Sequence, residues 1–86
     1  MGKSDKIFSK AKASPANVIL SELCALAESV GFVFRNQAGS HRIYKHPKLS
    51  EMMNFQPDKQ NPAKAKPYQV RQLVKVIETH GLMEEE

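Results

Sequence analysis

The stretch GFVFRNQAGSHRIYKHP, Gly31–Pro47, decides the fold of this 86-residue chain. Aromatic and β-branched residues open the stretch and return near its end, and such residues suit a pleated, half-buried surface. Between these two runs, small residues favour a tight connection, in which Gly39 is free to adopt a positive φ. The stretch therefore predicts an antiparallel hairpin with strands over 32–37 and 41–46.

Apolar stripes on either side of the hairpin predict two helices. The first begins near Leu20, and its apolar residues recur at the spacing of one helical face until Gly31 ends it. The second opens at Pro67, a favourable first helical residue, and stops at Gly81. Between the hairpin and this helix, we expect a third strand over 52–56.

The order helix, three strands, helix predicts an α+β fold of two layers. An antiparallel sheet with both helices on one face buries both apolar stripes. The core is expected to contain Phe32, Phe34 and Phe55. Residues 57–66, with two prolines and three lysines, predict a mobile loop.

The chain divides into an N-terminal extension over 1–19, a domain over 20–82 and an acidic tail over 83–86. Within the extension, residues 1–13 form either a short amphipathic helix or a tail that orders only on contact.

Composition narrows the class of protein. A single cysteine, Cys24, excludes an intramolecular disulfide and a zinc site built from cysteines. The three histidines lack the spacing of metal ligands, so we expect neither a metal nor a cofactor. No apolar run approaches the roughly 20 residues of a membrane span. These features favour a cytoplasmic protein without a membrane partner.

The formal net charge of +4 suits nucleic acid, an acidic protein or an anionic membrane. Basic residues on the hairpin and around the last helix are candidate phosphate contacts, although a solvated helix face is the simpler explanation for Arg71. Tyr44 could stack on an unpaired base, although a core position is commoner for such a tyrosine. The candidate RNA contacts are Arg35, Arg42, Tyr44, Lys45, Lys66 and Arg71.

His41 follows the turn of the hairpin and has several cationic residues near it in sequence. It is the strongest candidate for a catalytic residue. A free imidazole exchanges protons near neutral pH and can act as a general acid or base on RNA, which supplies its own 2′-hydroxyl nucleophile. An exposed turn histidine with no task is the alternative. Strand alternation also leaves the direction of His41 open, because either Ile43 or Tyr44 could face the core.

An ordered set of motifs resembles the HicA toxin family over residues 20–82. The set consists of Gly31-Phe32, Gly39-Ser40-His41-x-x-Tyr44, Pro47 and Ala65-Lys66-Pro67-Tyr68. The resemblance implies a double-stranded-RNA-binding-domain-like fold, ribosome-independent mRNA cleavage and a HicB-type antitoxin that masks the active site. It also places the family's catalytic histidine at His41 and its turn glycine and serine at Gly39 and Ser40.

Together these features predict the toxin of a toxin–antitoxin pair, a metal-independent endoribonuclease that acts on mRNA through His41. Two alternatives remain at this point. The same fold could bind RNA without cutting it, or a basic face could dock an acidic protein. In a pure binding module, His41→Ala would leave both the RNA affinity and any biological effect intact.

Overall fold

The computed structural model describes residues 3–83 and shows the predicted α+β architecture. The acidic residues 84–86 lie outside the described part. The elements, in order, are α1 (Lys3–Ala13), the 3-10 helix η1 (Pro15–Asn17), α2 (Leu20–Ser29), β1 (Val33–Ala38), β2 (His41–Lys45), β3 (Met52–Phe55) and α3 (Pro67–His80). From α2 to α3 the order α-β-β-β-α is that of a double-stranded-RNA-binding-domain-like fold, as predicted.

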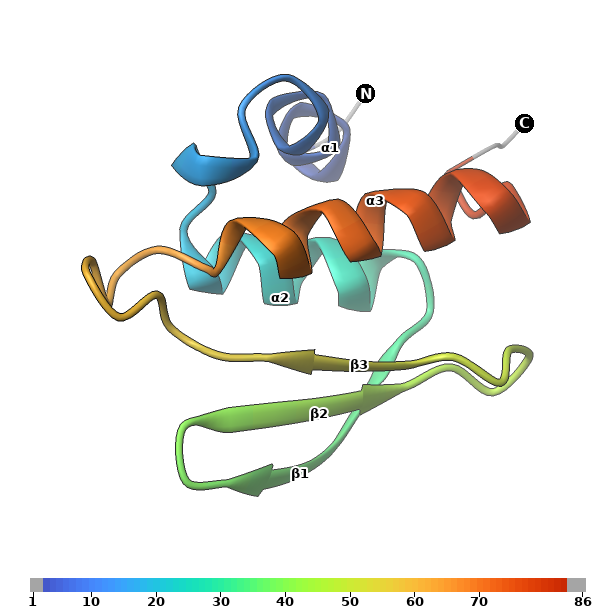
Figure 1. Ribbon diagram of the computed structural model, residues 1–86. Coiled ribbons are helices and arrows are strands. Elements are labelled where there is room, and N and C mark those ends of the chain that lie inside the picture. Colours follow the sequence, from blue (N-terminus) through green and yellow to red (C-terminus); the bar gives the residue numbers. More distant parts are fainter. Residues whose placement is uncertain (1–2, 84–86) are drawn as a thin grey trace.

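The three strands form one antiparallel sheet in the order β1-β2-β3. Helices α2 and α3 lie together on one face of this sheet, and α1 lies on the outer side of the two helices (Figure 1). We call the sheet surface that points away from the helices the open face. The N-terminal helix therefore adds a further tier to the predicted two layers and leaves the open face uncovered by any described helix.

Tyr44 is the core-facing residue of β2, with 3 % of its surface exposed. Phe32 and Phe55 are also buried, as predicted. The prediction for Phe34 is wrong, because 46 % of this side chain is exposed. Phe34 lies opposite Tyr44 on the edge strand β1, and the centroids of the two rings are 5.5 Å apart. One side of the Phe34 ring therefore contacts the tyrosine, and the other side of the Phe34 ring faces solvent.

The segment 57–66 is anchored rather than loose, which differs from the predicted mobile loop. The Ala65 N–H donates to the Val18 carbonyl at 2.9 Å, and the Leu20 N–H donates to the Ala63 carbonyl at 3.0 Å. The extended backbone that precedes α2 thus gives this segment a strand-like partner. Backbone pairing of this kind fixes the entry to α3 relative to α2.

Residues 3–13 confirm the helical alternative for the N-terminal segment. Ile7 and Ala11 are buried against the other helices. Lys10 Nζ lies 2.8 Å from a Glu22 carboxylate oxygen, and this hydrogen-bonded cation lowers the pKa of Glu22. Because the pair is partly exposed, its contribution to stability is modest, and burial of the two apolar side chains is the main attachment of α1.

Candidate active site

His41 is the first residue of β2 and lies on the open face. Successive strand residues point to opposite faces, and Tyr44 points into the core. His41, Ile43 and Lys45 therefore share the face away from the helices. The structure thus resolves the direction that the sequence left open. Gly39 has a φ of +62°, as expected for the turn residue.

Asn54 on β3 holds the His41 ring. Asn54 pairs with Ile43 in the sheet register, and its Oδ1 lies 3.1 Å from His41 Nδ1. A carbonyl oxygen accepts a hydrogen bond, so Nδ1 carries the proton in this contact. Within residues 3–83, His41 Nε2 has no hydrogen-bond partner, and in the neutral ring it presents a lone pair. This arrangement suits a general base.

The turn before His41 is open to a ligand. An added Cβ at Gly39 would meet nothing within 4 Å, so a ligand could approach the backbone closely at this position. The Gln37 side chain donates to the Gly39 carbonyl at 3.1 Å and braces the turn. Ser40 is exposed, and its hydroxyl has no partner among the described residues.

Arg42 and Tyr44 lie on the helix side of the sheet, away from His41. The Arg42 guanidinium is 3.9 Å from Cys24 Sγ, beside α2. The Tyr44 hydroxyl donates to a Glu28 carboxylate oxygen at 3.0 Å, and burial raises the pKa of Tyr44. The buried ring argues against the prediction that Tyr44 stacks on a base, and alternation along β2 removes Arg42 from the face that carries His41.

Lys66 and Arg71 belong to the helical layer. Lys66 is the N-cap residue of α3, and Arg71 is exposed on the second turn of that helix. Helix α3 covers the face of the sheet opposite to the open face (Figure 1). The structure therefore does not bring these two candidates together with His41.

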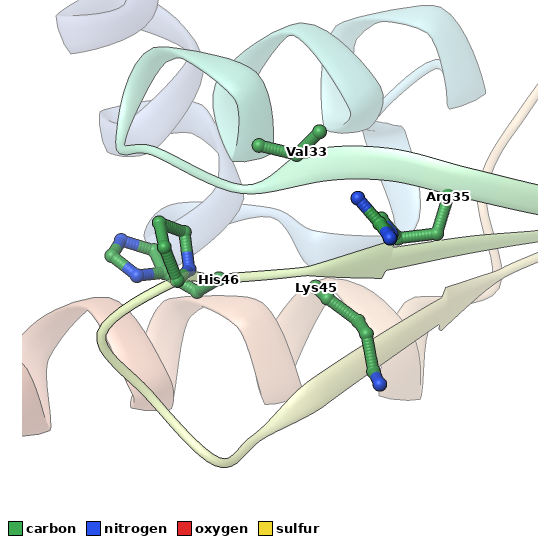
Figure 2. Close-up of a pocket in the computed structure, with 5 residues that line it drawn as sticks. Val33, Arg35, Lys45 and His46 are labelled. Atoms are coloured by element: carbon green, nitrogen blue, oxygen red, sulfur yellow. The ribbon is translucent and has the colours of Figure 1, made fainter.

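Arg35 and Lys45 gather at the other end of the hairpin. Arg35 occupies a bulge, where the β1–β2 register shifts between Phe34 and Asn36. Arg35 and Lys45 rise from adjacent strands (Figure 2), and both line an open hollow of about 230 Å³. We call this the basic hollow. Its lining residues are Val33, Arg35, Lys45, His46 and Pro47.

The other two histidines have structural partners. His46 Nε2 donates to the Val30 carbonyl at 3.0 Å, and His46 Nδ1 accepts from the Lys48 N–H at 3.1 Å. His80 lies 3.1 Å from a Glu51 carboxylate oxygen and lowers the pKa of that group. Within residues 3–83, no cluster of three His, Cys, Asp or Glu side chains could hold a metal ion.

Asn54 is the site residue that sequence reasoning missed. Its contact with His41 depends on the register between β2 and β3, which residues 46–51 set and which no local pattern reveals. One signal was present, because asparagine is disfavoured in strand interiors. An asparagine among apolar residues of a short strand suggests a specific polar partner on a neighbouring strand.

Comparison with known proteins gives one family. The sequence model described as the HicA toxin of bacterial toxin–antitoxin systems matches residues 20–82, from the start of α2 to just beyond α3. No curated protein and no solved structure matches the chain. None of the helices within residues 3–83 is long and apolar enough to cross a membrane. Since the family match spans most of the sequence, the chain belongs to the HicA toxin family of bacterial toxin–antitoxin systems.

Proposed function

We propose that this protein is an endoribonuclease that cleaves mRNA without a metal ion, with His41 as its single catalytic histidine. The observation that carries the proposal is the contact between His41 Nδ1 and Asn54 Oδ1 on the open face. This contact selects the ring tautomer whose Nε2 accepts a proton. Family membership supports the toxin role.

The reaction follows from that tautomer. Nε2 of His41 takes the proton of a ribose 2′-hydroxyl as the 2′-oxygen forms a bond to the adjacent phosphorus. The bond from phosphorus to the 5′-oxygen breaks, and the leaving oxygen takes a proton from water. The hydroxide that remains takes the proton from Nε2 of His41 and regenerates the base. The products are a 2′,3′-cyclic phosphate, which water can later open, and a 5′-hydroxyl. One positioned base accelerates the reaction by about 10²–10⁴-fold, and this modest acceleration fits a slow enzyme.

The turn supplies polar groups for the reacting phosphate. The Ser40 hydroxyl adjoins His41 in sequence and, among the described residues, is not engaged elsewhere. Gly39 leaves the backbone of the turn approachable. A hydrogen bond from Ser40 to a phosphate oxygen would stabilise the charge that develops in the transition state.

The open face also suggests the form of the substrate and the mode of inhibition. An exposed sheet surface with cations at its margin suits single-stranded or locally unpaired RNA. We propose that a HicB-type antitoxin inhibits by covering this surface, so that RNA cannot reach His41. Action on mRNA places the protein in the cytoplasm.

The decisive assay uses a labelled mRNA fragment in the presence of EDTA. We expect cleavage to continue, and the upstream product to end in a cyclic phosphate. A matched substrate with a 2′-deoxyribose at the cleaved position should stay intact, because it lacks the nucleophile. Loss of cleavage in EDTA would contradict the proposal. Binding of RNA without cleavage under all conditions would instead support a non-catalytic RNA-binding module.

Asn54→Leu is expected to lower kcat about tenfold. This is the loss expected when one hydrogen bond that orients a reacting group is removed. The substitution removes the acceptor that selects the Nδ1–H tautomer, but it retains a residue of similar size on an exposed strand position. KM should change little, because Asn54 acts through His41. Steady-state cleavage kinetics measure the two constants separately.

Asn54→Asp is the matched control for this role. A carboxylate keeps the acceptor and adds a negative charge, which favours the protonated imidazole. A general base must be neutral, so the acid limb of the pH–rate profile should move to higher pH while activity at alkaline pH is retained. An Asn54→Leu variant with wild-type kcat, or an unmoved profile in Asn54→Asp, would remove Asn54 from the mechanism.

A further inference from the structure

We propose that the basic hollow is a subsite that binds a nucleotide of the RNA at a distance from the cleaved bond. The proposal rests on the proposed function and adds to it a second binding position on the same surface. Its ligand is a phosphodiester with its ribose or base, held at the end of the hairpin opposite to His41. Longer RNA would therefore bind better than RNA that reaches only the catalytic histidine.

Lys45 lies well apart from His41 along β2. Lys45 and His41 point to the same face of β2 and are separated by four residues, about 13 Å along a strand. This separation favours contacts of the two side chains with different phosphates. An extended strand of RNA that lies along β2 would instead bring a phosphate a few nucleotides away to Lys45.

Two cationic residues line the hollow, and neither has a carboxylate partner among the described residues. Within residues 3–83, neither Arg35 nor Lys45 takes part in an ion pair. Val33 lies opposite Lys45 in the β1–β2 register, and Arg35, two residues further along β1 at the bulge, lines the same hollow. Their side chains rise from adjacent strands (Figure 2). Such a pair attracts a phosphate by charge and by hydrogen bonding.

The remaining walls of the hollow fit the other parts of a nucleotide. Val33 is 47 % exposed and provides apolar surface beside Pro47. The His46 ring is fixed by hydrogen bonds at both nitrogens and by an edge contact with Phe32, 5.1 Å between ring centroids. A rigid, partly apolar wall next to two cations suits a ribose or base attached to the phosphate.

The salt dependence of binding tests the subsite. The probe is a single-stranded oligoribonucleotide long enough to span the open face, measured against wild type and Arg35→Gln/Lys45→Gln. Each lost phosphate contact should weaken binding about threefold to tenfold. The loss of each phosphate contact should also reduce the slope of log affinity against log salt by about 0.7. Lys6→Gln, on helix α1 far from the sheet (Figure 1), removes one charge as a control and should leave the slope unchanged.

Cleavage of two RNA lengths separates this proposal from the proposed function. Wild type should cleave the long oligonucleotide with a lower KM than a dinucleotide that reaches only His41, and the double variant should lose most of that preference. If wild type cleaves but the double variant keeps the preference and the salt slope, the subsite is wrong and the nuclease stands. If neither protein cleaves but the slope falls as expected, the subsite stands and the nuclease is wrong.

Discussion

His41→Ala should reduce the rate of RNA cleavage by about 10²–10⁴-fold, the contribution of a positioned general base, with RNA affinity retained. The imidazole lies on the open face and is partly exposed, so its removal deletes the proton acceptor without opening the core. The measurement is single-turnover cleavage of a labelled mRNA fragment, with affinity determined separately by fluorescence anisotropy.

His80→Ala is the matched control for His41→Ala. It removes an exposed imidazole that pairs with Glu51, and it should cleave at the wild-type rate. Both variants should unfold at nearly the wild-type denaturant concentration, since neither side chain is buried. A His41→Ala protein that cleaves as fast as the control would end the catalytic assignment. Cleavage would then depend on a group other than His41.

The order of the elements could be predicted because each carries a local signal. Apolar residues at helical spacing mark α2 and α3, and Pro67 and Gly81 mark the ends of α3. The class of the fold follows, since two amphipathic helices need a sheet to cover. These signals involve neighbours in sequence, and no tertiary contact is needed to recognise them.

The faces of the strands could not be predicted, because alternation alone does not choose between Ile43 and Tyr44. The choice depends on Phe34 and Met53, which lie opposite Tyr44 in the two neighbouring strands. Once Tyr44 faces the helices, Arg42 follows it and His41 takes the other face. The orientation of Tyr44 thus divides the predicted RNA contacts of β2 between the helix side of the sheet and the open face.

The partners of the site residues were hidden for a related reason. Asn54 reaches His41 through the β2–β3 register, and Arg35 lies near Lys45 through the β1–β2 register, in which Val33 pairs with Lys45. Register and bulges reflect packing between segments that are distant in sequence. Local sequence patterns can therefore suggest which residue types do the chemistry, but they cannot reveal which residues orient them.

Gly31→Ala is expected to lower the free energy of unfolding by about 2–3 kcal/mol, as the sum of a backbone and a steric effect. Gly31 has a φ of +106°, a backbone conformation that residues other than glycine rarely adopt. An added Cβ would also lie 2.6 Å from His46 Nε2. The ring must then move and lose its hydrogen bond to the Val30 carbonyl. Urea unfolding, followed by circular dichroism, measures the loss.

Combining Gly31→Ala with His46→Ala separates these two effects. Without the imidazole, the new methyl group has space, so the double variant should be more stable than the sum of the single losses predicts. The cost of the positive φ should remain in both backgrounds. Strictly additive losses would contradict the steric contact. His46 also forms a wall of the basic hollow, so packing at Gly31 and the shape of the hollow depend on the same ring.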